Sequence, residues 1–101
     1  MEPVAHPLLQ QLTLQPAADD QLLWHCPLSQ EHVMQLVPSL LAQLDCQLGA
    51  LQQGADRLFW SVTFEEVALQ LHFEGLCDSL WLQGPSAEIH FLRGLAAKVT
   101  Q

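Results

Sequence analysis

The segment from Leu58 to Gln83 reads LFWSVTFEEVALQLHFEGLCDSLWLQ, and every second side chain along most of it is large and apolar. This period of two is typical of β-strands that bury one face. The pattern is interrupted at Glu65-Glu66 and at residues 75–78. It therefore predicts three strands, over residues 58–64, 67–74 and 79–83. Connections this short permit only antiparallel pairing.

The lengths of the two turns set the register of this ribbon. A two-residue turn at Glu65-Glu66 places Phe59 opposite His72, and a four-residue loop over residues 75–78 places His72 opposite Trp81. Directly opposed side chains on one face lie about 4.5–5.5 Å apart at Cβ. We therefore expect Phe59, His72 and Trp81, called the aromatic row below, to cross three strands on the face opposite the buried Trp60.

Two helices are predicted where apolar residues recur with the 3.6-residue period of an α-helix. Ser29 is the expected N-cap of the first helix, whose apolar stripe is Val33, Met34, Val37, Leu40, Leu41 and Leu44. Pro38 lies inside it, and we expect a kink rather than an end because the stripe continues in phase. Ser86 is the expected N-cap of the second helix, whose stripe is Ile89, Leu92, Leu95, Ala96 and Val99.

The remaining elements are shorter. Residues 1–6 are expected to fray, and Pro7 suits the first position of a short helical turn. Strands are expected over residues 12–15 and 21–26, and a weak one over residues 46–52. The order is β-β-α-β-β-β-β-α, in one α+β domain over residues 1–101. It is expected to form a two-layer sandwich, a mostly antiparallel sheet of about five or six strands with two helices on one face.

Composition limits the classes of partner. Among the 101 residues, three Lys or Arg stand against eleven Asp or Glu, a formal net charge of −8 at pH 7. Such a balance argues against binding to nucleic acid or to an anionic membrane, which both require clustered cations. No apolar run is long enough for a membrane span, and the N-terminus lacks the cations of a secretory signal. Three widely spaced cysteines do not suggest a disulfide framework, so we expect a cytoplasmic protein.

Catalytic and metal-binding patterns are weak. The His and Cys residues show no CxxC, HxxxH or HExxH spacing, so no metal or cofactor is expected. Cys26, near the start of the first helix, is better placed for a thiolate than Cys77, which has acidic neighbours, but no third catalytic group is identifiable. Adjacent carboxylates at Asp19-Asp20 and Glu65-Glu66 lie in turns that water solvates. We therefore expect a protein that is not an enzyme.

The function expected is a non-enzymatic protein-interaction domain that uses its open sheet face and self-associates, for example as a homodimer. Phe59, His72 and Trp81 are the candidate protein-binding residues, because aromatic side chains with uncharged neighbours are enriched at interface centres. Two other interpretations stay open. The cross-strand pairs that these three residues form can serve only to stabilise the sheet, or the N-terminal segment can fold over them.

Two alternative functions also remain. In size, acidity and α+β content the chain resembles the dimeric chaperones of bacterial type III secretion, which implies a dimer that holds a partly unfolded segment. The resemblance covers no motif, and the predicted order lacks the initial helix of those chaperones, so no binding residue is carried over. The other alternative is a small-molecule-binding domain with a pocket between sheet and helices, around Trp24, Cys26 and Trp60.

Overall fold

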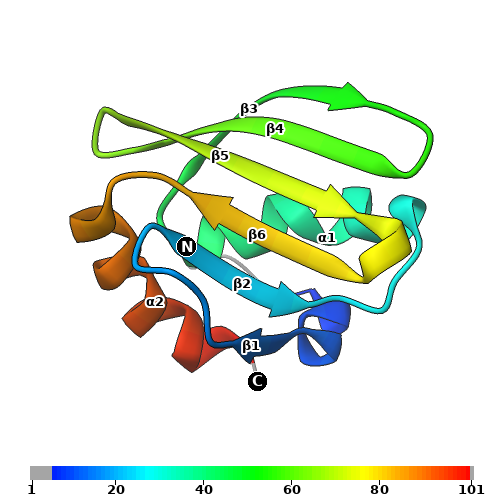
Figure 1. Cartoon of the computed structure of the whole chain (residues 1–101), viewed down its shortest axis with the longest axis horizontal. Coiled ribbons are helices and arrows are strands. Elements are labelled where there is room, and N and C mark those ends of the chain that lie inside the picture. Colours follow the sequence, from blue (N-terminus) through cyan, green and yellow to red (C-terminus); the bar gives the residue numbers. More distant parts are fainter. Residues whose placement is uncertain (1–5, 101) are drawn as a thin grey trace.

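The computed structural model describes residues 6–100 and confirms the α+β fold with its predicted order of strands and helices (Figure 1). Residues 1–5, most of the stretch expected to fray, lie outside the described residues. The elements are η1 (Pro7–Gln11), β1 (Thr13–Gln15), β2 (Gln21–His25), α1 (Gln30–Gln43), β3 (Gln47–Gln53), β4 (Arg57–Phe64), β5 (Val67–Glu74), η2 (Gly75–Cys77), β6 (Ser79–Gln83) and α2 (Ser86–Val99).

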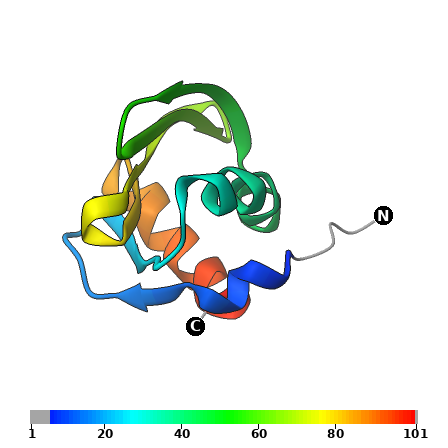
Figure 2. The same ribbon diagram turned by 90° about the vertical axis from the view of Figure 1, so that its right-hand side faces the viewer.

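The six strands form one sheet in the order β1-β2-β6-β5-β4-β3, and every neighbouring pair is antiparallel. Figure 2 shows that the sheet curves around the two helices, with β3 and β4 over α1. Both helices therefore lie on the concave side. The convex face, called the outer face below, is turned to the viewer in Figure 1 and carries no helix.

The predicted register is confirmed. Phe64 pairs with Val67 across the tight turn, and Phe59 pairs with His72 on the same two strands. His72 in turn pairs with Trp81 on β6. The turn lengths were therefore sufficient to align β4, β5 and β6.

The β4–β5 turn has an unusual composition. Glu65 and Glu66 have φ angles of 48° and 69°, so both lie in the left-handed region. A two-residue hairpin turn with two positive φ angles favours Asn-Gly or Asp-Gly, because a Cβ atom makes this conformation costly by about 1–2 kcal/mol per residue. Two glutamates therefore hold a backbone geometry that neither favours.

Glu66→Gly is expected to raise the free energy of unfolding by about 1 kcal/mol, because glycine adopts a positive φ without steric cost. Urea denaturation measures this change, and Glu66→Gln is the matched control that removes the charge but keeps the Cβ. An equal gain in both variants would show that charge, not backbone conformation, causes it.

Helix α1 begins and ends at recognisable caps. The Ser29 side chain accepts a hydrogen bond from the amide of His32, as predicted, and the helix continues through Pro38. At its other end the amides of Asp45 and Cys46 donate to the carbonyls of Ala42 and Leu41, which is a Schellman motif. Asp45 has the positive φ, 57°, that this motif places after the cap.

Two details of the predicted helices were wrong. Leu36 of α1, which is absent from the predicted apolar stripe, is fully buried, while Met34 of that stripe is partly buried and packs against the core. Ser86 is the first residue of α2 rather than its cap. Pro85 holds the cap position and makes no side-chain hydrogen bond, because the proline ring has neither a donor nor an acceptor.

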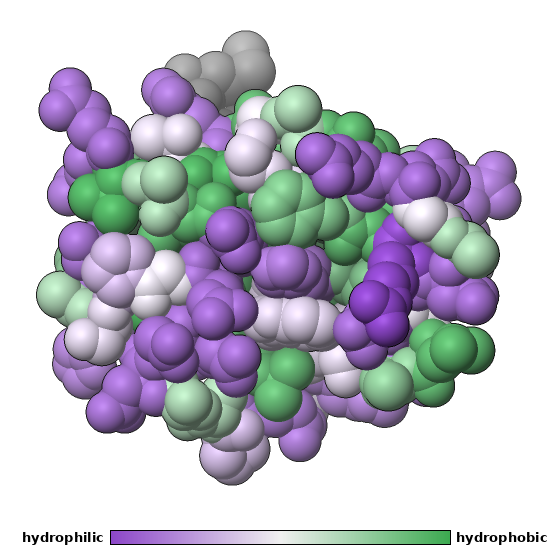
Figure 3. All heavy atoms as spheres, turned by 45° about the horizontal axis from the view of Figure 1, so that its top comes forward, coloured by the Kyte–Doolittle hydropathy of each residue, from purple (hydrophilic) through white to green (hydrophobic). Residues whose placement is uncertain are grey.

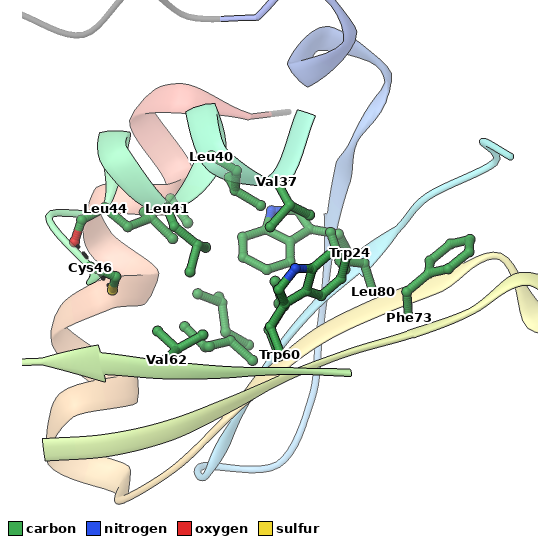
Figure 4. Close-up of a cluster of buried hydrophobic side chains, with 14 of the residues drawn as sticks. Trp24, Val37, Leu40, Leu41, Leu44, Cys46, Trp60, Val62, Phe73 and Leu80 are labelled. Atoms are coloured by element: carbon green, nitrogen blue, oxygen red, sulfur yellow. Dashed lines mark hydrogen bonds between the residues drawn. The ribbon is translucent and has the colours of Figure 1, made fainter. Parts of the chain in front are cut away.

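The core lies between the concave side of the sheet and the helices. Figure 4 shows Trp24 and Trp60 pointing from β2 and β4 toward Val37 and Leu40 of α1. The side chain of Trp24 is fully buried, and its indole Nε1 donates to Thr100 Oγ1 at 2.9 Å. These tryptophans and the fully buried Cys26, around which the alternative ligand pocket is predicted, all belong to one cluster of buried hydrophobic residues.

The weak strand is the exposed edge strand β3. All seven of its residues are exposed, and its pairing with β4 shifts between Leu48 and Leu51. Within this bulge the Ala50 amide donates to Ser61 Oγ. A Cβ on Gly49 would lie 2.8 Å from the Ser61 carbonyl oxygen, so the close approach requires glycine here.

Candidate outer-face interaction site

The aromatic row is a set of contacting rings. The ring centroids of Phe59 and His72 are 4.9 Å apart in an edge-to-face arrangement with an interplanar angle of 66°. Those of His72 and Trp81 are also 4.9 Å apart, but their rings are stacked at 10°. All three side chains are partly buried, so each covers part of its neighbour and leaves the remainder exposed on the outer face.

The row extends one strand further than the sequence indicated. Strand β2 pairs with β6 so that Leu23 lies opposite Trp81, and Leu23 is also partly buried. The pairing of β2 with β6 joins segments about 60 residues apart, so no turn length could reveal it. The outer face therefore carries four adjacent uncharged or weakly basic side chains across β2, β6, β5 and β4.

Polar side chains flank this row on both sides. One flank is uncharged and consists of Gln21, Gln83, Gln70 and Ser61, aligned by the same pairings. The other flank contains His25, Ser79, Glu74 and Arg57. In the space-filling view of Figure 3, green and pale atoms gather near the middle of the face between purple hydrophilic ones.

The N-terminal segment does not cover this face in the part of the chain that the structure describes. Strand β1 pairs with β2 at the sheet edge, through Thr13 with His25 and Gln15 with Leu23. His6, the last residue of the stretch expected to fray, caps η1, and its amide donates to Ser39 Oγ at 2.9 Å. Pro7–Gln11 is then the short helical turn expected at Pro7.

His72 is the titratable member of the row. Its Nε2 lies 3.3 Å from Gln70 Oε1, and the two rings that pack against it exclude water. Burial lowers the pKa of His72 below its ordinary value, while the negative charge of Glu74 raises it less strongly. The neutral imidazole is therefore the form that the folded protein prefers.

This preference predicts a pH dependence of stability. Because the pKa is lower in the folded state, the unfolded state binds protons first as the pH falls. The stabilisation from neutral His72 is complete above about pH 6.5, the ordinary value, and is lost as the pH falls through the lower folded value.

The measurement compares wild type with His72→Gln by urea denaturation at pH 7.5, 6.5 and 5.5. Wild type should lose more stability over this range than the variant. His25→Gln, a change to an exposed histidine on the same face, serves as control. Parallel curves for wild type and His72→Gln would contradict the prediction.

The cysteines are free thiols, two of them inaccessible. Cys26 and Cys46 are buried and Cys77 is exposed. Burial raises the pKa of Cys26 to about 12 and that of Cys46 to about 11. The expectation that Cys26 is better placed for a thiolate than Cys77 was wrong, because Cys26 is buried and its loss of hydration outweighs the Leu28 backbone hydrogen bond that lowers its pKa.

Other chemical groups remain dispersed. Within residues 6–100, no three His, Cys, Asp or Glu side chains gather where they could hold a metal ion. In the same range no helix has both the length and the apolar character needed to cross a membrane. The aromatic row, together with Leu23, therefore remains the candidate functional site.

Fold and site together define a small acidic α+β protein with an open antiparallel sheet and an aromatic outer face. The chain belongs to the family described as "Protein of unknown function (DUF3630)", whose pattern matches residues 4–98. Comparison with curated proteins found no match, and comparison with solved structures found none either.

Proposed function

We propose that this protein is a non-enzymatic protein-interaction domain that self-associates through its outer face. The observation that carries the proposal is the continuous, partly exposed row of Leu23, Trp81, His72 and Phe59 on a sheet face that no helix covers. Interface centres are enriched in aromatic residues and depleted of charge, and this face has both properties.

The distribution of charge favours a second copy as the occupant. The chain carries a net charge of −8, so two copies repel each other over most approaches. Among the described strand residues of the outer face, Arg57 and Glu74 are the only ones of fixed charge, and their signs are opposite. Their nearest charged atoms are 3.9 Å apart. Electrostatic repulsion between two copies is therefore weakest when their outer faces meet. Contact between identical faces is the arrangement of an isologous dimer.

The absence of an enzymatic role is part of the proposal. The buried thiols of Cys26 and Cys46 are held protonated, which argues against thiolate chemistry at either position. The same acidity disfavours nucleic acid and anionic membranes as partners. We place the protein in the cytoplasm because its three cysteines are unpaired and one is exposed.

Sedimentation equilibrium at neutral pH tests self-association. We expect wild type to show a concentration-dependent mass that approaches a dimer, because the outer face can bury its aromatic rings only against another surface. In Phe59→Ser/Trp81→Ser, which removes both outer rings, the mass should stay that of a monomer.

Phe91→Ser is the matched control, since it removes an exposed ring from α2 on a different surface and should leave the dimer intact. Circular dichroism checks that each variant folds. A wild type that remains monomeric at millimolar concentration would overturn the proposal, as would a dimer that the double substitution does not weaken.

A further inference from the structure

We propose that a hollow beside the start of α2 binds the guanidinium group of an arginine in a basic peptide segment of another protein. The hollow is lined by Phe64, Glu65, Ala87, Glu88 and Phe91 and has a volume of about 280 Å³. It lies at the β4–β5 turn rather than on the outer face, so this inference goes beyond the proposed self-association.

The aromatic part of the hollow is held in place by the core. Phe91 is 57% exposed, the only aromatic side chain among the large exposed hydrophobic residues in the described part of the chain. Its ring stacks at 5.8 Å, with an interplanar angle of 25°, on Phe64, which is 4% exposed. A buried ring thus supports an exposed one and leaves aromatic surface facing solvent, which is what a cation–π contact requires.

The charged part of the hollow has one sign. Glu65 comes from the β4–β5 turn and Glu88 from the first turn of α2, and no basic residue is among the lining side chains. Carboxylates beside an exposed aromatic ring match a guanidinium, which is planar, stacks on rings and donates up to five hydrogen bonds. A lysine ammonium satisfies the charge but not the planar stacking.

The chain's own cations do not supply this group. Arg57 lies by Glu74, with 3.9 Å between their nearest charged atoms. Arg93 donates to the carbonyl oxygens of Gln21 at 2.6 Å and Ala18 at 3.3 Å. Lys98 is in the last turn of α2, whereas the hollow is at its first. A net charge of −8 also attracts a basic partner, so the occupant that fits is an arginine-containing segment of another chain.

The test is an NMR titration of the protein with the capped peptide Gly-Arg-Gly-Arg-Gly at low ionic strength. Saturable shifts are expected at the amides of Glu65, Glu88 and Phe91, and the same peptide with citrulline in place of arginine should cause none. Phe91→Leu keeps an apolar side chain but removes the ring, and it should weaken affinity about twofold to fivefold.

Glu88→Gln should weaken affinity more than its matched control, Glu31→Gln, which removes the corresponding acid from the first turn of α1. Equal weakening by these two would mean that overall charge holds the peptide and would overturn the proposal. Shifts that map elsewhere, or an unchanged affinity in Phe91→Leu, would also overturn it. The double variant Phe59→Ser/Trp81→Ser should bind the peptide with the affinity of wild type. The peptide titration and the sedimentation experiment can therefore fail independently of each other.

Discussion

Trp60→Ser is expected to lower the free energy of unfolding by about 3–5 kcal/mol, because the change empties a large volume in a packed core. Trp60 is 3% exposed, and it pairs with Leu71 on one side and with Leu51 on the other. Its indole points toward α1, as Figure 4 shows, so its loss leaves a cavity between sheet and helix. Small domains are stable by only about 5–15 kcal/mol, so the variant loses a large share of its stability and unfolds if the wild type lies at the lower end of that range.

Urea denaturation measures the effect, and Phe59→Ser is the matched control. Phe59 is the next residue on the same strand but points to the outer face, where cross-strand pairs contribute about 0.2–1 kcal/mol each. A comparable loss in the two variants would contradict the assignment of the two faces.

Thr100→Val is expected to lower the free energy of unfolding by about 1–3 kcal/mol, although the two side chains have nearly the same shape. The Thr100 hydroxyl accepts from Trp24 Nε1 at 2.9 Å and donates to the Ala96 carbonyl oxygen at 3.0 Å. Valine leaves the indole N–H without a partner in a fully buried position, and an unsatisfied buried donor is costly.

A double-mutant cycle with Trp24→Phe isolates this contact. Phenylalanine has no N–H, so Thr100→Val should cost less in the Trp24→Phe background than in wild type. Additive costs would show that the hydrogen bond contributes nothing beyond packing.

The alternation of side chains predicted most of the sheet because it reports a local property. Trp60 and its partners recur at every second position, so the buried face of β4 and β5 could be read directly. The turn at Glu65-Glu66 then fixed the register, even though its residues are not those that favour this turn. A short turn leaves few possible registers between the two strands it joins. The aromatic row could therefore be predicted from the sequence.

Non-local pairing explains what the sequence did not reveal. Leu23 joined the aromatic row only because β2 pairs with β6, and that pairing depends on how the sheet closes over both helices. Phe91 left a signal that could have been used. It is two residues beyond Ile89 and four residues before Leu95, which places it at the border of the predicted apolar stripe rather than within it. Its contact with Phe64 again depends on tertiary packing.

Intermolecular NOEs in a sample that mixes isotope-labelled and unlabelled copies test the claim about the outer face most directly. The account predicts contacts between the Trp81 ring of one copy and Phe59 or Leu23 of the other. Contacts that arise instead from α2 or from the β3 edge would contradict it, as would their absence at millimolar concentration.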